Sequence, residues 1–299
     1  MLKRNLVKSV LMGICISVST FSALCKNEGE KVRLSDKQTE TVAKKKDDPK
    51  TMKSVRERIT LKEGEKVRIA CVGNSITAGS GIKDAGKNGY PAQLNRLLGA
   101  KYKVQNCGAS GATMMKTSQN PWMYYASFKD GKFAGVDYAK NSNHFQKALD
   151  MQPHVVIIKL GTNDSKKDYW DAHKDEFESE MQLLIDKFKE NGKAKGIKPV
   201  FYLCYPSKSD DKKQAHGVRN FIIEQEIIPR INALAKKNRL NVIDLHYDLL
   251  NPTDDTYFWS DMRNDPYKND GLHPNKKGAG ELAKKIKETL DRTLTVKWK

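Results

Sequence analysis

The chain has 299 residues, with 54 lysines and arginines against 36 aspartates and glutamates, and a formal net charge of +18. Hydrophobic residues make up 38% of it, which excludes a wholly disordered chain. A mean hydropathy of −0.68, without an apolar run long enough to cross a bilayer, excludes a polytopic membrane protein. Most of the positive excess lies in residues 1–60 and 275–299 and forms no basic stripe interleaved with aromatic residues, so it does not indicate nucleic-acid binding.

The first residues have the pattern of an export signal. Basic residues at positions 3, 4 and 8 precede a short apolar stretch over residues 9–24. Residues 1–25 are therefore expected to be removed or anchored, residues 26–60 to form a charged linker, and residues 61–299 to form a single domain. We expect a periplasmic or secreted protein, and a lipoprotein anchored at Cys25 is the alternative.

Five apolar segments are expected to be strands, and helical patterns separate them. The strands are residues 67–72, 102–106, 155–160, 199–204 and 240–244. Residues 177–188 have apolar side chains on one helical face, and a long helical region over residues 217–238 is expected to be kinked or split at Pro229. This alternation predicts a three-layer α/β/α fold with a five-stranded parallel sheet. Ligands of such sheets bind at the carboxyl ends of the strands.

The loops after these strands carry groups suited to acyl transfer. Gly73-Asn74-Ser75 follows the first strand, residues 106–111 (Asn-Cys-Gly-Ala-Ser-Gly) follow the second, and Gly161-Thr162-Asn163-Asp164 follows the third. Asp270-Gly271-Leu272-His273 lies beyond the fifth strand. Together they provide a hydroxyl on a tight turn, a histidine with a nearby carboxylate, and donors for an oxyanion.

These four segments, in this order, resemble those of the SGNH (GDSL-type) hydrolase family over roughly residues 65–292. The four residues that name the family correspond to Ser75, Gly108, Asn163 and His273. The family's aspartate corresponds to Asp270. One difference is that Asn74 stands where the family commonly has an aspartate before the serine.

The resemblance implies a flavodoxin-like fold and a serine esterase mechanism. His273 would accept the proton of the Ser75 hydroxyl, and Asp270 would orient the imidazole. The backbone N–H groups of Ser75 and Gly108 and the side-chain amide of Asn163 would form the oxyanion hole. No cofactor and no metal are required.

Asp164 and Asp244 are interpreted as structural residues. The five other histidines, at positions 144, 154, 173, 216 and 246, show no metal-ligand spacing and have no assigned role.

The substrate is expected to be an acetylated carbohydrate. Aromatic residues gather in the segments 112–145 and 246–268, and such rings suit the apolar faces of sugars. Packing of the same rings within the loops is an equally good interpretation. The candidate substrate contacts are Trp122, Tyr124, Trp259, Arg263 and Arg219, with an arginine available for the carboxylate of a sialic acid.

The function expected from the sequence is the removal of O-acetyl groups from sialic acid or a plant or host glycan. The resemblance is to exported carbohydrate esterases such as sialate O-acetylesterase-like proteins. The alternatives are a lysophospholipase or thioesterase and a non-catalytic carbohydrate-binding surface protein.

Three cysteines remain outside the leader, Cys71, Cys107 and Cys204. These cysteines are interpreted as small buried hydrophobic residues, and a disulfide between Cys71 and Cys107 is the alternative.

Overall fold

The computed structural model describes residues 54–118, 120–124, 143–213, 215–260 and 268–299. The predicted export signal, most of the charged linker and the lipid-anchor candidate Cys25 lie outside these residues, as does Arg263. No helix among the described residues is both long enough and apolar enough to cross a membrane.

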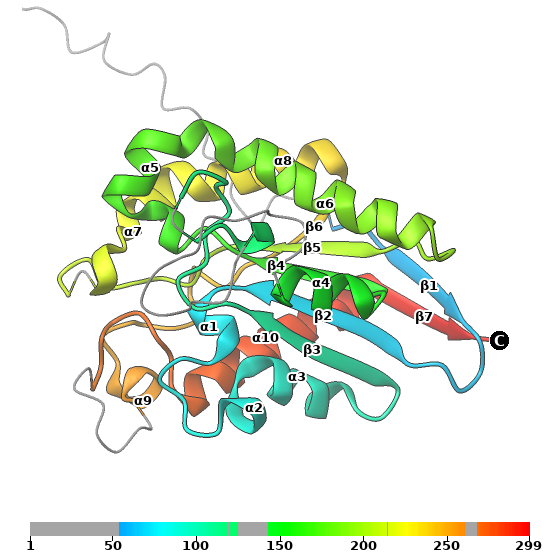
Figure 1. The fold of residues 1–299 in the computed structure, drawn as a ribbon. Helices are drawn as coiled ribbons and strands as arrows, with labels where there is room; N and C mark the ends of the chain where they lie inside the picture. Colours follow the sequence, from blue (N-terminus) through cyan, green and yellow to red (C-terminus); the bar gives the residue numbers. More distant parts are fainter. Residues whose placement is uncertain (1–53, 119, 125–142, 214, 261–267) are drawn as a thin grey trace, which may run out of the picture. The chain divides into compact units, whose positions relative to one another are not determined.

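A five-stranded parallel sheet forms the centre of the domain, as predicted (Figure 1). Its strand order is β3-β2-β4-β5-β6. The strands are β2 (Val67–Gly73), β3 (Tyr102–Gly108), β4 (Val155–Lys159), β5 (Val200–Cys204) and β6 (Asn241–Ile243). β4 and β5 are buried throughout, because helices cover both faces of the sheet.

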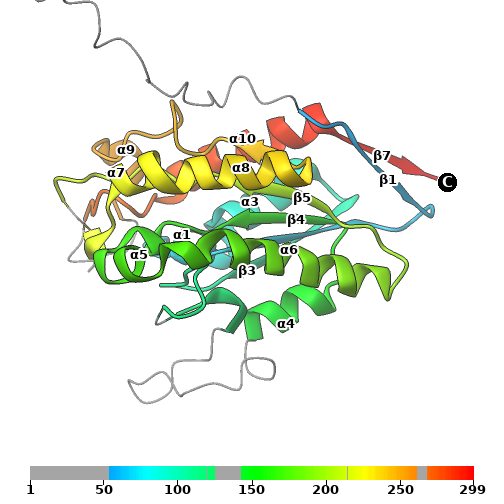
Figure 2. The ribbon, with the colours of Figure 1, turned by 90° about the horizontal axis from the view of Figure 1, so that it is seen from above.

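Helices on the two sides complete the three layers (Figures 1 and 2). One face is covered by α3 (Tyr90–Leu98) and α10 (Lys276–Thr293), and the other by α4 (Asn143–Asp150), α6 (Phe177–Lys193) and α8 (Ile228–Asn238). Shorter helices are α1 (Ser75–Ala78), α2 (Ala85–Asn88), α5 (Lys167–His173), α7 (Asn220–Ile222) and α9 (Asp255–Phe258).

The helical region expected over residues 217–238 runs without a break from Asn220 to Asn238, so the chain is not split at Pro229. A π-helical segment, Ile223–Ile227, follows α7, and α8 begins at Ile228 with Pro229 in its first turn. Proline has no N–H to donate to the preceding turn, and a change of hydrogen-bonding pattern such as a π-helical segment is one way in which a helix accommodates it.

Two further strands were not predicted. β1 (Glu57–Leu61) and β7 (Leu294–Trp298) form a separate two-stranded parallel sheet. β1 begins inside the segment that the sequence analysis assigns to the charged linker, so regular structure starts earlier than the expected boundary at residue 61.

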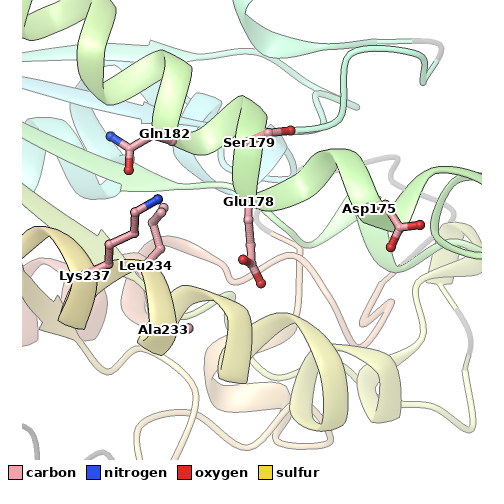
Figure 3. Close-up of a pocket in the computed structure, with 7 residues that line it drawn as sticks. All are labelled: Asp175, Glu178, Ser179, Gln182, Ala233, Leu234 and Lys237. Carbon is pink, nitrogen blue, oxygen red and sulfur yellow. The ribbon is translucent and has the colours of Figure 1, made fainter.

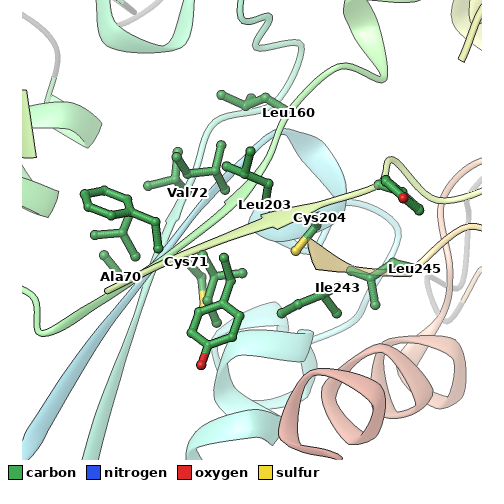
Figure 4. Close-up of a cluster of buried hydrophobic side chains, with 14 of the residues drawn as sticks. Ala70, Cys71, Val72, Leu160, Leu203, Cys204, Ile243 and Leu245 are labelled. Atoms are coloured by element: carbon green, nitrogen blue, oxygen red, sulfur yellow. The ribbon is translucent and has the colours of Figure 1, made fainter. Parts of the chain in front are cut away.

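The core consists of aliphatic side chains from the strands packed against the helices, and Figure 4 shows the part around β2, β5 and β6. Cys71, Cys107 and Cys204 are buried and free, so the Cys71–Cys107 bridge is not formed. Burial raises the pKa of the Cys107 and Cys204 thiols to about 12. These cysteines are therefore unreactive hydrophobic residues.

Candidate active site

Ser75 stands at the carboxyl end of β2, as the first residue of α1. The Asn74 side chain accepts a hydrogen bond from the Ile76 N–H at 3.2 Å and so caps this single helical turn. Gly73 is required because a Cβ there would lie 2.1 Å from the Thr77 hydroxyl oxygen. Asparagine therefore caps the turn in the position where the family commonly has aspartate, and Ser75 is held half-buried on a sharp bend.

The structure brings Ser75, His273 and Asp270 together. His273 Nε2 lies 2.8 Å from Ser75 Oγ, and His273 Nδ1 lies 2.6 Å from Asp270 Oδ2. The other oxygen, Asp270 Oδ1, accepts the backbone N–H groups of Leu272 and His273, both at 2.8 Å. These bonds fix the carboxylate relative to the imidazole. Ser75 thus has the geometry of a nucleophile, His273 that of its base and Asp270 that of the acid that orients the base.

Burial alone would raise the pKa of the Asp270 carboxyl. The hydrogen bond from the His273 side chain, the charge of that imidazole and the backbone N–H bonds outweigh burial, so the pKa of Asp270 lies below its ordinary value. Asp270 is therefore ionised at neutral pH and can accept from His273 Nδ1.

Gly271 explains the tight turn between the acid and the base. It has a φ of +72°, and a Cβ at this position would lie 2.7 Å from the Asp210 Cβ. The Asp210 N–H donates to the Gly271 carbonyl oxygen at 2.9 Å. The loop after β5 thus supports the turn that carries Asp270 and His273.

Asn163 lies in the loop after β4, beside the loop that follows β3. Its Nδ2 donates to the Ala112 carbonyl oxygen at 2.9 Å, which leaves its second amide hydrogen for another acceptor. The adjacent Asp164 accepts the N–H groups of Met114 and Met115, at 2.7 and 3.1 Å. Asp164 is fully buried, and burial raises the pKa of its carboxyl to about 6 despite these hydrogen bonds. Asp164 therefore links the loop after β4 to the loop after β3.

The assignment of Gly108 as an oxyanion donor needs correction. Its N–H donates to the Asn106 side-chain oxygen at 2.9 Å. A Cβ at Gly108 would lie 2.3 Å from the Ala78 nitrogen, so this glycine allows α1 to pack on β3. Gly111, in the same segment, has a φ of +77°, and its N–H has no hydrogen-bond partner among the described residues. Gly111 immediately precedes Ala112, which binds Asn163, so it is the better candidate donor.

Two of the predicted substrate contacts also need correction. Trp122 is completely buried, its Nε1 donates to the Cys107 carbonyl oxygen at 2.9 Å, and its ring meets Phe145 edge to face. It belongs to the core. Arg219 donates to the Ser165 carbonyl oxygen at 2.6 Å and to Asp171 at 2.7 Å, so its charge is already paired.

Trp259 remains a candidate substrate contact, because its side chain is exposed. The neighbouring Ser260 hydroxyl donates to the Gly81 carbonyl oxygen at 3.2 Å. A Cβ on Gly81 would lie 3.8 Å from the His273 Cβ. Trp259 is therefore next to a segment that borders the candidate site. The Tyr124 side chain lies outside the described part of the structure, as does Arg263.

A second histidine, His216, lies against His273 and Asp270. No role was expected for it from the sequence. Its ring meets that of His273 edge to face with centroids 5.5 Å apart, and its Nε2 lies 3.8 Å from Asp270 Oδ2. His216, Asp270 and His273 form the one His/Cys/Asp/Glu group in the described residues that is compact enough to ligate a metal ion. No spacing in the sequence signalled it, because His216 comes from the distant loop after β5.

A surface hollow of about 510 Å³ lies elsewhere, between α6 and α8 (Figure 3). Its lining residues are Asp175, Glu178, Ser179, Gln182, Ala233, Leu234 and Lys237. None of them belongs to the segments that carry Ser75, Asp270 or His273, and the hollow offers no nucleophile paired with a base.

The chain resembles known proteins in sequence. Residues 71–280 match the model of the GDSL-like lipase/acylhydrolase family. An acetylxylan esterase from Xylanibacter ruminicola is 35% identical over 233 residues, which are 74% of this chain and 42% of that protein. The chain thus spans less than half the length of this relative.

Solved structures with the same fold include an aryl esterase from M. smegmatis and Est24, a carbohydrate acetylesterase from Sinorhizobium meliloti. The first has a TM-score of 0.52 at 19% identity, covering 76% of this chain and 100% of the other. The second has a TM-score of 0.50 at 17% identity, covering 76% and 99%. At these identities the likeness concerns the fold.

Proposed function

The chain belongs to the GDSL-like lipase/acylhydrolase family, and from this premise we propose that it is a serine esterase that removes O-acetyl groups from carbohydrates. The observation that carries the proposal is the 2.8 Å approach of His273 Nε2 to Ser75 Oγ, with Asp270 bound to the other ring nitrogen. A serine hydroxyl in this arrangement can be deprotonated as it attacks a carbonyl carbon.

In the first half-reaction, Ser75 Oγ attacks the acetyl carbonyl while its proton passes to His273 Nε2. Asp270 accepts the hydrogen bond from Nδ1, so the imidazole presents its lone pair to Ser75 and the cation that forms is stabilised. Nε2 then gives the proton to the departing sugar oxygen, and an acetyl group remains on Ser75. Water, deprotonated by His273, attacks this ester and releases acetate.

We assign three donors to the negative oxygen of the tetrahedral intermediate. They are the Ser75 N–H at the start of α1, the Gly111 N–H, and the Asn163 amide hydrogen that does not bind Ala112. Each donor of this kind contributes about 3–4 kcal/mol of transition-state stabilisation. Asp164 supports this arrangement by fixing the Met114 and Met115 backbone beside Asn163.

A neutral acetylated polysaccharide such as acetylxylan is the proposed substrate class. The 35% identical relative bears the name acetylxylan esterase. An exposed indole, Trp259, adjoins Ser260, whose hydroxyl contacts the Gly81 segment beside His273, and such a ring suits the apolar face of a sugar. A sialic acid is less well supported, since Arg219 is bound to Asp171. The export signal proposed for residues 1–25 would take the enzyme to extracytoplasmic glycans.

A fluorophosphonate probe and acetate release together test the proposal. We expect the probe to label Ser75, and acetate to be released from acetylxylan faster than from acetylated sialic acid. Ser75→Ala should abolish both labelling and release. Ser80→Ala is the matched control, because the Ser80 hydroxyl bonds to the Ser110 hydroxyl and not to His273.

Label on another residue, or acetate release by Ser75→Ala, would contradict the mechanism. Preference for p-nitrophenyl octanoate over the acetate ester would favour a lysophospholipase or thioesterase instead. A folded protein that binds acetylated xylan fragments without hydrolysing them would favour a carbohydrate-binding role.

A further inference from the structure

His216 reaches the candidate active site through an unusual backbone conformation. Its φ is +56°, and Gly217 follows with a φ of +74°. Left-handed backbone is uncommon for residues other than glycine, although histidine is among those that adopt it more often. Two successive left-handed residues turn the chain so that the His216 imidazole lies beside the imidazole of His273.

The three side chains offer a suitable ligand set for a transition metal. One ligand atom from each of His216, Asp270 and His273 lies within 4.8 Å of the other two. In a tetrahedral zinc site with metal–ligand distances of about 2.0–2.2 Å, ligand atoms lie about 3.4 Å apart. The His216–Asp270 separation of 3.8 Å would shorten slightly, and the His273–Asp270 separation of 2.6 Å would lengthen.

The exposure of His216 and the negative charge of Asp270 both favour the binding of a cation from solvent. The His216 side chain is 47% exposed, whereas those of His273 and Asp270 are 14% and 12% exposed. A solvated ion can therefore meet His216 first and then reach the more buried pair, and water can fill the fourth position. The ionised Asp270 attracts a cation, and Lys166, which acts electrostatically on His216, weakens that attraction.

We propose that His216, Asp270 and His273 form an inhibitory binding site for a zinc-like divalent transition metal. Two imidazoles and one carboxylate select Zn²⁺ or Cu²⁺ over Mg²⁺ or Ca²⁺, which prefer all-oxygen ligand sets. The binding part of the proposal stands on the geometry alone. The inhibitory part rests on the proposed esterase function.

Inhibition follows from the tautomer that metal binding imposes. In the metal-free site, His273 Nδ1–H donates to Asp270, and the Nε2 lone pair faces Ser75. A metal ion bound at Nδ1 takes the lone pair of that atom, so the proton of the neutral ring moves through solvent to Nε2. Nε2–H then faces Ser75 Oγ and cannot accept its proton. The ring keeps one proton throughout, and no oxidation or reduction occurs.

Direct metal titration tests the binding part. The full chain, free of any polyhistidine tag, is titrated with Zn²⁺ by calorimetry, and separately with Mg²⁺. We expect one bound Zn²⁺ per chain and no bound Mg²⁺. His216→Asn, which tolerates left-handed backbone, should weaken Zn²⁺ binding at least about tenfold, since it removes one of three ligands. His216→Gln is the second variant, and thermal melts establish that each one folds.

Two further variants separate the metal site from catalysis. His173→Gln is the matched control, because His173 is a part-exposed histidine that pairs with Glu176. Ser75→Ala should bind Zn²⁺ as the unaltered chain does, although it has no turnover. Absence of Zn²⁺ binding, or equal binding by the folded His216 variants, would overturn the proposal.

Rate measurements then test inhibition, each protein being compared with its own metal-free rate. Zn²⁺ should lower the hydrolysis of p-nitrophenyl acetate, excess chelator should restore it, and His216→Asn should need at least about tenfold more Zn²⁺. Binding without loss of rate would refute the inhibitory part alone. If the chain hydrolyses no ester, the esterase proposal fails, and the calorimetric result still decides the metal site.

Discussion

His273 Nε2 and Ser75 Oγ lie 2.8 Å apart although 198 positions separate the two residues in the chain. The parallel sheet explains this approach. Ser75 follows β2, an inner strand of the sheet, and His273 immediately precedes α10, which packs against α3 on one face. Because all five strands point the same way, the loops that follow them meet at one edge.

Replacement of Asp270 by asparagine should lower kcat for acetyl ester hydrolysis by about 10³–10⁴-fold. An asparagine amide can donate to His273 Nδ1, which would favour the tautomer with a proton on Nε2, the atom that must accept the Ser75 proton. Steady-state kinetics on p-nitrophenyl acetate measures the effect. Asp171→Asn, which removes a carboxylate paired with Arg219, serves as the control and should change kcat less than about threefold. Equal losses in the two variants would contradict a specific role for Asp270.

Asn163→Ala should reduce kcat by about 10²–10³-fold, because an amide donor to the oxyanion is removed. The substitution also removes the hydrogen bond to Ala112, so thermal melts must accompany the kinetics. Asn88→Ala, which removes an exposed side-chain bond to the Lys83 carbonyl oxygen, is the control. Turnover near that of the unaltered chain in a folded Asn163→Ala protein would show that the oxyanion assignment is wrong.

Much of the fold was predictable, because buried parallel strands are apolar throughout and stand out in the sequence. The family match confirms the SGNH-type family and the enzyme class, a carboxylic ester hydrolase, and the five-stranded parallel sheet is confirmed as well. β1 was missed because its alternating pattern lies in a charged segment, and its partner β7 lies at the other end of the domain.

The wrong expectations for Gly108 and Trp122 arise from tertiary contacts that a sequence pattern does not contain. Gly108 and Gly111 stand in one short segment, and their roles differ through tertiary contacts, such as the bond from the Gly108 N–H to the Asn106 side chain and the packing of Gly108 on α1. Trp122 was proposed as a substrate contact because it belongs to the aromatic segment 112–145, but its indole turns inward toward Cys107, in line with the alternative that these rings pack within the loops. Side-chain direction in long loops depends on tertiary packing, and no periodic pattern encodes it.

The two tryptophans should therefore respond differently to replacement by alanine. Trp122→Ala should lower the free energy of unfolding by about 3–5 kcal/mol, because it empties a buried site. Trp259→Ala should change it by less than about 0.5 kcal/mol, because the ring is exposed. The same Trp259→Ala variant should raise KM for acetylxylan and leave p-nitrophenyl acetate kinetics nearly unchanged. Urea unfolding and kinetics on both substrates provide the comparison, and an unchanged KM for acetylxylan would remove Trp259 from the substrate contacts.

Asp164 predicts a specific dependence of stability on pH. Its buried carboxyl has a pKa of about 6 in the folded protein, against an ordinary value of 3.8. Between these values the folded chain holds a proton at this site that the unfolded chain does not. Protonation therefore stabilises the folded protein as the pH falls from about 6 towards 4, by at most about 1.4 kcal/mol per pH unit. Above about pH 6 the buried charge lowers the free energy of unfolding.

Asp164→Asn isolates this contribution. The amide oxygen can still accept from the Met114 and Met115 N–H groups, and the group carries no charge at any pH. We expect the variant to be at least as stable as the unaltered chain at pH 7, and to lose that advantage between pH 6 and 4. Urea midpoints at pH 4.5, 5.5, 6.5 and 7.5 measure the difference between the proteins, with the exposed Asp168→Asn as control. A stability difference that stays constant over this range would contradict a raised pKa for Asp164.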